Sequence, residues 1–406
     1  MPQGNPLTAA VVAGLLRVRM NWKQALLAVL ASLSVIASFN IAYALQIPMK
    51  IERSFPFGSI LNVYDVGIDS NSGLLFFSDD DNHALVAIDM KENHTKSIAI
   101  GGYPYRIAVN PATNKVYVTH ACNCQAGYSV SVIDFSKGFN GSKVVQIENA
   151  SIPYSRIAVN QNTNRVYATS SDSITVIDGS ADRAIGIINV PASDVAVNYN
   201  TNTIYAIDNN DTLYKIDGLT NAIISRITVG STSYSNTSQS WSTVRPFMLA
   251  VNPNTNVAYL LNSIDSSAQQ GEFSLSQYHL MAVNGSSNTI INPSITVISG
   301  LNTELSMNPN NNRLYVIQGD SEILTLDGRT NQLAYALANP VPPYYRGVVI
   351  DTSTNKLYIH SQTGIFQISD SGIAAPEFES FPLAIAFASA VMTILILQKH
   401  RKSERK

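Results

Sequence analysis

The chain alternates short apolar runs with short polar segments in a pattern that repeats. Arg106–His120 reads RIAVNPATNKVYVTH, and Arg156–Ser170 reads RIAVNQNTNRVYATS. In each copy an apolar run ends in Asn, a few polar residues follow, and a second run carries valine and tyrosine. Two β-prone runs joined by a short Asn-rich segment are typical of an antiparallel hairpin.

The same frame occurs seven times, with 38 to 56 residues between successive copies. In each copy an Asn or Asp opens the turn, and an aromatic residue follows seven positions later. Asn and Asp accept hydrogen bonds from the backbone of a turn, and an aromatic ring fills the space between stacked sheets. The turn-opening residues are Asp69, Asn110, Asn160, Asn198, Asn252, Asn308 and Asp351. The aromatic residues are Phe76, Tyr117, Tyr167, Tyr205, Tyr259, Tyr315 and Tyr358.

A third strand ending in Asp or Asn follows most of these hairpins, and then a fourth, as in ITVIDGS and IGIINV. Seven units of four antiparallel strands predict an all-β fold, a seven-bladed β-propeller. The seventh unit lacks its fourth strand, whereas the segment Lys50–Gly58 precedes the first hairpin. We therefore expect this N-terminal strand to close the last blade and remove its open edge. An open β-solenoid or a string of sandwiches is the alternative.

The repeats resemble the YVTN family of β-propeller proteins, in which the hairpin, a VIDG turn and a following TN recur. Asp217–Asn221 and Asp327–Asn331 carry this DG and TN pattern, although His120 and Ser170 stand where the family's tetrapeptide ends in Asn. The resemblance covers residues 48–372. It implies a propeller of a surface-exposed repeat protein, often archaeal, and no common reaction.

The residues before the propeller predict an export signal. Ala25–Ile47 is apolar over the length of a membrane span and follows several basic residues. Residues 1–47 are therefore expected to be a signal peptide or a retained signal anchor, with Ala42 and Ala44 at the positions of a cleavage site. Met20 is an alternative start, because the chain from this residue has an ordinary signal-peptide length.

The residues after the propeller predict a membrane anchor. A linker is expected at 373–380, a transmembrane helix at 381–398 and a basic cytoplasmic tail at 399–406. This arrangement resembles the C-terminal anchors or sorting signals of archaeal surface proteins. The chain would thus lie in the cell membrane with hydrophobic helices at both ends and its propeller, residues 48–372, on the extracellular side.

The composition of the chain makes some classes of binding partner unexpected. The chain is 45% hydrophobic and only 13% charged, with a net charge of −2. A chain without a basic surface is not expected to bind nucleic acid. Export is consistent with sequons for N-glycosylation, which fall outside the apolar cores of the hairpins. Their asparagines are Asn93, Asn140, Asn149, Asn210, Asn236 and Asn284.

The central channel has a charged mouth in the predicted propeller. The residue four positions before each turn-opening residue should lie at one end of the channel, beside aromatic residues such as Tyr105 and Tyr345. We predict a shallow pocket there for a sugar, a carboxylate or a peptide side chain. Alternatively, these charges pair with one another and only solvate the channel. The seven residues are Asp65, Arg106, Arg156, Asp194, Met248, Glu304 and Gly347.

The longest insertions fall on the same face as this mouth, in blades 2 and 5. The blade 2 insertion holds both cysteines, Cys122 and Cys124, directly after His120. A disulfide, two unpaired thiols, and a copper or zinc site formed with His120 are the three possibilities. Asp79–His83 forms either a calcium loop or a solvated acidic turn.

These patterns favour a binding or adhesion module over an enzyme. We find no Ser/His/Asp triad and no phosphate-binding glycine loop in the sequence. The leading hypothesis is a membrane-anchored extracellular module that binds a protein or glycan and has no resident cofactor. The alternative is a metal-dependent propeller enzyme of the lactonase type or a soft-metal-binding surface protein.

Overall fold

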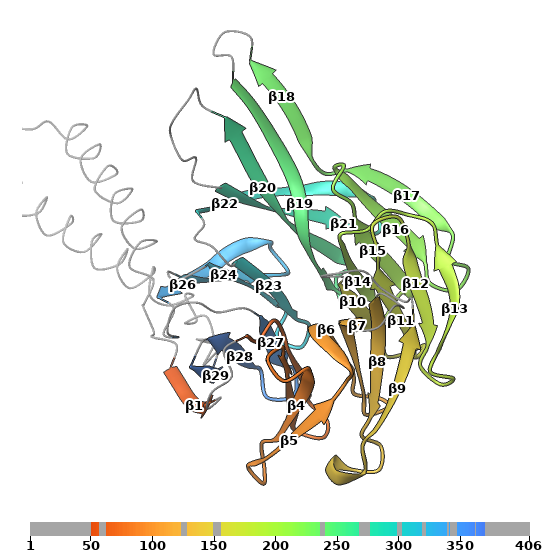
Figure 1. The fold of residues 1–406 in the computed structure, drawn as a ribbon. Helices are drawn as coiled ribbons and strands as arrows, with labels where there is room; N and C mark the ends of the chain where they lie inside the picture. The colour runs from red at the N-terminus through yellow and green to blue at the C-terminus, as the bar shows by residue number, and fades with distance from the viewer. Residues whose placement is uncertain are drawn as a thin grey trace, which may run out of the picture. The chain divides into compact units, whose positions relative to one another are not determined.

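The chain is a seven-bladed β-propeller (Figure 1). The described residues form seven antiparallel sheets, whose innermost strands contact one another in a closed ring. The predicted all-β fold with four-stranded blades is therefore confirmed. The computed structural model describes residues 50–56, 62–122, 128–148, 156–235, 240–267, 277–298, 303–318, 322–338, 341, 347–361 and 363–369.

Each innermost strand ends at the Asn or Asp that the sequence pattern predicts as the turn-opening residue. From blade 1 to blade 7 these strands are β2 (Val66–Asp69), β6 (Gly102–Asn110), β10 (Ile157–Asn160), β14 (Asp194–Asn198), β19 (Ser240–Asn252), β23 (Thr303–Asn308) and β27 (Val348–Asp351). The second strands carry the predicted aromatic residues and are β3 (Leu74–Asp79), β7 (Lys115–Cys122), β11 (Arg165–Thr169), β15 (Thr203–Ile207), β20 (Val257–Ser267), β24 (Arg313–Gln318) and β28 (Lys356–Ser361).

The outer half of each blade completes the sheet. The third strands are β4 (Ala84–Asp89), β8 (Tyr128–Asp134), β12 (Ile174–Asp178), β16 (Thr212–Asp217), β21 (Gln277–Asn284), β25 (Glu322–Asp327) and β29 (Gly364–Ser369). The fourth strands of blades 1 to 6 are β5 (His94–Ala99), β9 (Lys143–Glu148), β13 (Arg183–Ile188), β17 (Ile223–Thr228), β22 (Thr289–Ile298) and β26 (Gln332–Ala338). A short 3-10 helix, Phe139–Gly141, lies before β9.

The turn after each innermost strand is held by the side chain that opens it. In blade 4 the Oδ1 atom of Asn198 accepts the backbone N–H groups of Asn200 at 3.0 Å and Thr201 at 3.2 Å. The turn ends with Asn202 in the left-handed region at φ 51°. Asn tolerates this conformation better than most side chains, which explains why it recurs at this position.

A ladder of asparagine side chains joins neighbouring blades. The Nδ2 group of each turn-opening Asn donates to the Oδ1 atom of the left-handed Asn in the next blade, and the turn-opening side chains are buried. We call this set the asparagine ladder. Its pairs are Asn110 with Asn164, Asn160 with Asn202 and Asn198 with Asn256, each at 2.8 Å, Asn308 with Asn355 at 2.9 Å, and Asn252 with Asn312.

The N-terminal strand β1 (Lys50–Pro56) closes the ring, as predicted. It pairs with β29 in antiparallel register and forms the outermost strand of blade 7. Phe55 is buried there against Tyr358, with ring centroids 6.5 Å apart. Arg53 reaches into blade 1, where its guanidinium donates to the carbonyl oxygen of Met90 at 2.8 Å. One strand thus completes the last blade and joins it to the first.

Strand direction separates two faces of the propeller. The tight turns between first and second strands lie on what we call the turn face, and the connections between second and third strands lie on the opposite loop face. Lys356 begins β28 directly after such a turn and pairs with Ser369. Ser369 in turn pairs with Lys50. Both ends of the propeller chain therefore leave from the turn face.

Blade 5 departs from the simple pattern. An additional strand, β18 (Ser231–Ser235), pairs with Ser240–Val244 at the start of β19. Figure 1 shows β18, β19 and β20 projecting beyond the other blades. The sequence predicts loops for the insertions of blade 5, which is wrong for the parts that form strands. Their Ser, Thr, Tyr and Trp residues have the β propensity that this pairing needs.

The predicted hydrophobic helices at the chain ends lie outside the described residues. All described residues belong to one compact unit, Met49–Lys406. Within them no helix has the length and apolarity that a membrane crossing requires.

Removing one rung of the asparagine ladder should weaken the fold. We expect Asn198→Ala to lower the unfolding free energy by about 1–3 kcal/mol, because the turn of blade 4 and Asn256 of blade 5 lose their hydrogen bonds to this buried side chain. Denaturant unfolding of the purified chain measures this loss. The matched control is Asn210→Ala, an exposed Asn in the same blade. Equal stability of the two variants would contradict the proposed role of the ladder.

Closure of the ring also predicts a stability change. Phe55→Ala should lower the unfolding free energy by about 3 kcal/mol, because a buried ring is lost from the core of blade 7. Deletion of Lys50–Gly58 should in addition expose the edge of β29 and cause aggregation. Ser54→Ala, at an exposed position of the same strand, serves as the control. A monomeric deletion variant with unchanged melting would show that β1 does not close the ring.

Candidate ligand-binding site at the loop face of the channel

The predicted channel-mouth residues come together around a polar cavity. We call Asp65, Arg106, Arg156, Asp194, Met248, Glu304 and Gly347 the collar. Six of them, all but Gly347, line a cavity of about 170 Å³ at the loop-face end of the channel. The prediction that residues four positions before the turns share one site is thus supported by the geometry of the described residues.

The two aspartates of the collar bind backbone in two blades at once. In Asp65 the Oδ1 atom accepts the N–H of Val66 at 3.0 Å, and Oδ2 accepts the N–H of Ile107 in blade 2 at 2.9 Å. Asp194 repeats this arrangement with its own neighbour Val195 at 2.8 Å and with Leu249 of blade 5 at 2.9 Å. Each carboxylate therefore fixes the innermost strand of the next blade.

Burial of these aspartates affects their ionisation. Desolvation raises the pKa of Asp65, although Arg106 and the N–H of Ile107 partly oppose it. Desolvation likewise raises the pKa of Asp194, opposed by Arg156 and by two backbone N–H groups. Buried acids with perturbed pKa values beside arginines in a concave site are typical of functional sites.

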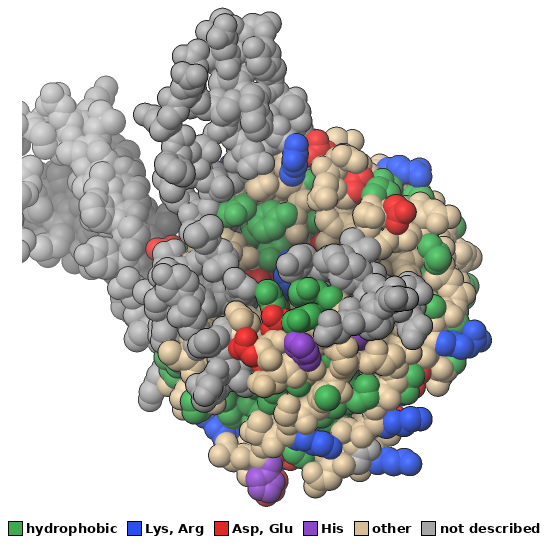
Figure 2. Space-filling model, viewed as in Figure 1, with side chains coloured by type: hydrophobic (Ala, Val, Ile, Leu, Met, Phe, Trp, Pro, Cys, Tyr) green, Lys and Arg blue, Asp and Glu red, His purple; other side chains and the backbone are tan. Residues whose placement is uncertain are grey.

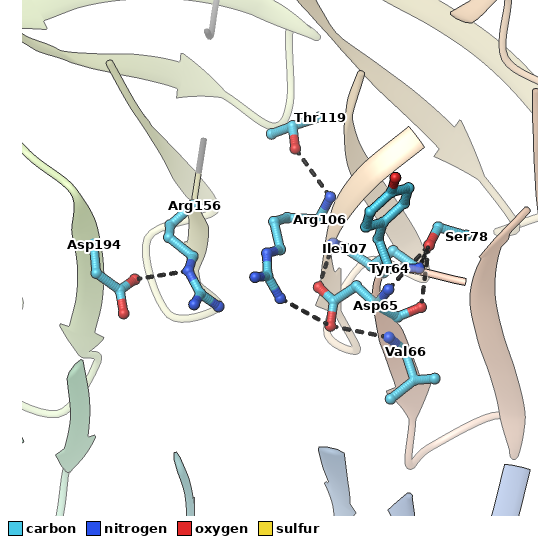
Figure 3. A network of polar contacts seen from close by, with 9 residues as sticks. All are labelled: Tyr64, Asp65, Val66, Ser78, Arg106, Ile107, Thr119, Arg156 and Asp194. Atoms are coloured by element: carbon cyan, nitrogen blue, oxygen red, sulfur yellow. Dashed lines mark hydrogen bonds and ion pairs between the residues drawn. The ribbon is translucent and has the colours of Figure 1, made fainter. Parts of the chain in front are cut away.

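The two arginines lie side by side with loose ionic contacts (Figure 3). Nη1 of Arg106 is 3.9 Å from Oδ1 of Asp65, and Nε of Arg156 is 4.0 Å from Oδ1 of Asp194. In Figure 3 the two guanidinium groups point toward each other. Burial, followed by the charge of Arg156, lowers the pKa of Arg106. Arg156 has a raised pKa, because Asp194, Glu304 and Asp65 outweigh its desolvation.

Glu304 completes the charged lining from the other side of the channel. It lies in β23 of blade 6, and in a ring of seven blades this position is opposite blades 2 and 3, which carry the arginines. Gly347 of blade 7 has φ +91°, and a Cβ atom there would lie 3.3 Å from Oδ1 of Asp65. A side chain at position 347 would therefore crowd Asp65. The collar residues that line the cavity are mostly charged.

Hydroxyl groups that the sequence analysis did not single out support the collar. Oγ of Ser78 accepts the N–H groups of Tyr64 at 2.8 Å and Asp65 at 3.0 Å. Thr119 and Thr169 accept the backbone N–H groups of Arg106 and Arg156 at 3.1 and 2.9 Å. These three hydroxyls follow the repeat aromatic by two positions, where blades 4 to 6 have Ile207, Leu261 and Ile317. This difference between repeats is the sequence feature from which these hydroxyl groups could have been predicted.

Aromatic residues border the collar on bulged strands. Register shifts occur between Pro104 and Arg106, and between Pro246 and Met248, so Tyr105 and Phe247 are the extra residues. A bulge redirects its side chain relative to the regular strand. Tyr105 packs edge-on against Tyr64, with ring centroids 5.6 Å apart. The other predicted aromatic, Tyr345, lies outside the described residues.

The structure gives His120 a role in packing. Its imidazole is fully buried, with Nε2 2.9 Å from Oγ of Ser131. The side chain of Cys122 and all of Cys124 lie outside the described residues, so the disulfide and the copper or zinc site stay predictions. Among the residues that the structure describes, no group of three His, Cys, Asp or Glu side chains is placed to hold a metal ion.

The acidic segment Asp79–His83 forms a hydrogen-bonded turn. The carboxylate of Asp79 accepts both the backbone N–H of Asn82 at 3.1 Å and its side-chain amide at 2.8 Å. The carboxylate of Asp81 accepts from the backbone and side chain of Asn62 at 3.3 and 3.0 Å. The two acids therefore serve different partners, and the calcium loop stays a prediction.

The described sequon asparagines lie in connections between strands or, for Asn284, at a strand end. Asn93, Asn140 and Asn210 are exposed, whereas Asn284 is half-buried at the end of β21. Asn149 and Asn236 lie outside the described residues. Figure 2 shows charged side chains singly or in small groups among the other side chains.

A second cavity of about 430 Å³ opens toward the turn face. Its walls include Val66, Val109, Val251 and Met307, and no charged side chain lines it. The charged chemistry of the channel therefore lies at its loop-face end.

Comparison with known proteins supports the fold alone. A chain of Kuenenia stuttgartiensis hydrazine synthase is similar with a TM-score of 0.52 and 15% sequence identity, covering 79% of this chain and 99% of that chain. No family model matches, and no curated protein matches. An identity this low carries no inference about activity.

Burial of His120 predicts a pH-dependent stability. Burial lowers its pKa, so the unfolded chain binds this proton more readily than the folded chain. The unfolding free energy should therefore fall as the pH drops below about 6.5, the ordinary pKa of histidine. Denaturant titrations at about pH 5 and pH 7 measure the difference. His120→Gln should reduce this pH dependence, and exposed His94→Gln should leave it unchanged; an unchanged pH dependence in His120→Gln would contradict the prediction.

Proposed function

We propose that this protein is a membrane-anchored cell-surface module that binds an extracellular protein or glycan through the loop face of its propeller. The observation that carries the proposal is that the chain ends and the collar cavity lie on opposite faces of the propeller. Lys50 and Ser369 leave the propeller at the turn face, whereas the collar cavity lies at the loop face. A tether at one face leaves the other free for a partner.

The sequence supports the location of this module. The apolar stretches in residues 1–47 and 381–398 and the basic tail 399–406 suit an exported propeller whose C-terminus is cytoplasmic. The repeats resemble those of the YVTN family, and the C-terminal segment resembles archaeal sorting signals. Sequons in connections between strands suit a glycoprotein.

The projection of blade 5 adds surface to the same face. Strand β18 pairs with the part of β19 that precedes Arg245, on the loop-face side of the blade. A partner on the loop face would thus meet both the collar and this projection. Long elements on an otherwise short-turn scaffold commonly carry binding functions.

A metal-dependent hydrolase is the less favoured function. Such an enzyme needs carboxylates that are free to ligate a metal ion. Asp65 and Asp194 instead direct each of their oxygens at a backbone N–H group. The collar therefore suits recognition of a ligand better than metal-assisted hydrolysis.

Accessibility on intact cells tests this orientation. Ser171→Cys and Asn209→Cys place thiols on the loop face, and Ala112→Cys and Thr255→Cys place them on the turn face; all four positions are exposed. The background chain carries serine at both natural cysteines. We expect a membrane-impermeant maleimide on a bulky carrier to label the loop-face thiols several-fold faster, because the membrane shields the turn face.

Two results would contradict the proposal. Labelling of the loop-face thiols only after cell lysis would place the propeller inside the cell. Equal labelling rates on the two faces of intact cells would remove the argument for a free loop face. Labelling of the purified variants in detergent is the control, since all four thiols should then react at similar rates.

A further inference from the structure

The arginines of the collar have more donors than acceptors. Each guanidinium carries five N–H donors. Arg106 and Arg156 contact Asp65 and Asp194 only at 3.9 and 4.0 Å, beyond the usual 2.7–2.9 Å of a charge-assisted hydrogen bond. Within the described residues neither guanidinium donates a hydrogen bond to another group of the protein. These donors line the cavity, where an anionic group could accept from them.

The placement of the two arginines next to each other adds to this argument. Their like charges repel, which is one cause of the lowered pKa of Arg106. Both aspartates have turned their oxygens to backbone N–H groups and do not lie between the guanidiniums (Figure 3). A carboxylate placed between the guanidiniums would supply the missing acceptors and relieve the repulsion.

The opposite wall of the cavity carries a further acid. The side chain of Glu304 makes no hydrogen bond or ion pair with the described residues, and its charge acts on Arg156 from across the channel. With Asp65 and Asp194 it gives the collar three acids against two arginines. This excess of negative charge disfavours a multiply charged anion such as phosphate and favours a ligand that brings its own cation.

The size of the cavity limits the ligand. At about 170 Å³ it is smaller than the roughly 300–1,000 Å³ of pockets for drug-sized molecules. It therefore suits a molecule of the size of a single amino acid.

We propose that the collar binds one small zwitterion, a free amino acid or a compound of similar chemistry. Its carboxylate lies between Arg106 and Arg156, and its ammonium group faces Glu304. The inference rests on the proposed function, because it places the zwitterion at the centre of the loop face that is proposed to bind partners.

Calorimetric titration of the full-length chain in mild detergent tests the inference. The ligands are glycine, β-alanine and 4-aminobutyrate, which differ in the spacing of their charges, with acetate and methylammonium as single-charge controls. At least one zwitterion should bind tenfold or more tightly than acetate or methylammonium. No binding of any zwitterion, or equal binding of acetate, would overturn the proposal.

Substitutions in the collar test the assignment of each charge. Glu304→Gln should weaken zwitterion binding about tenfold and strengthen acetate binding, since repulsion of a carboxylate decreases while the contact with ammonium is lost. Arg156→Lys should weaken both, because lysine lacks the planar fork that binds a carboxylate. The matched control is Glu322→Gln, at an exposed glutamate of the same blade, which should change neither affinity. An unchanged ratio of zwitterion to acetate affinity in Glu304→Gln would overturn the assignment.

The two proposals fail in different experiments. Failure of the zwitterion titration leaves the labelling of loop-face thiols on intact cells unaffected. Failure of the labelling experiment leaves the affinities of the purified chain unaffected. Melting curves of each collar variant show whether a lost affinity reflects the site or an unfolded chain.

Discussion

The asparagine ladder is the interaction on which the rest of this propeller depends. Each turn-opening Asn ends an innermost strand, accepts backbone N–H groups of its own turn, and donates to the next blade. One side chain therefore fixes both the turn and the angle between two blades. The amide itself is buried, where it would cost roughly 1–3 kcal/mol if left unpaired. The arrangement joins five of the seven pairs of neighbouring blades.

The collar takes its geometry from the ladder. A residue four positions before the turn-opening residue lies about 13 Å away along an extended strand, at the other end of the channel. Because every repeat keeps the same register, the residue types at this position meet in one ring regardless of their chemistry. The fold can thus vary Asp65, Arg106 and Glu304 without altering the turns that hold the blades.

Departures from the repeat are matched by changes in the neighbouring blade. Blade 1 has Gly73 where the other turns have a left-handed Asn, so no side-chain acceptor exists there. The preceding blade accordingly ends its strand with Asp351. Burial alone would raise the pKa of Asp351. Hydrogen bonds, including one from Ser70 of blade 1, outweigh burial and lower this pKa. At the junction that closes the ring, Asp351 and Ser70 therefore take the place of the asparagine pair.

The aromatic slots show the same matching. Oη of Tyr117 lies 2.6 Å from where a Cβ atom of Gly179 in the next blade would be, so only glycine fits at that position. Phe76 has no hydroxyl, and the next blade has Phe135 in place of this glycine, with ring centroids 5.2 Å apart. At Gly179 and Gly285 a side chain would meet both a tyrosine hydroxyl of the preceding blade and the left-handed Asn of its own blade, whereas at Gly218 and Gly328 the nearest atoms belong to asparagines.

Sequence periodicity predicts those parts of the molecule that depend on local chemistry. The turns, the register of the aromatic residues, closure by β1 and the membership of the collar all follow from residue types at fixed spacing. The hydrogen bonds that Asp65 accepts from Ile107 and Asp194 accepts from Leu249 cannot be predicted in this way. They join neighbouring blades, and the repeat pattern does not specify the angle between blades. Strand β18 was missed because it pairs with an extension of β19 that no other blade has.

The contacts of the collar bear on its two interpretations. If its charges only solvated the channel, the acids and arginines would be expected to pair closely and satisfy one another. Asp65 and Asp194 instead bind backbone N–H groups, and the guanidiniums of Arg106 and Arg156 stay near 4 Å from the carboxylates. Desolvation of these aspartates raises their pKa values, which is a cost to the folded state. Aliphatic residues at these positions would avoid that cost, as Met248 shows in blade 5. A buried arrangement that costs stability and leaves strong donors unmatched supports the proposal of a ligand that completes it.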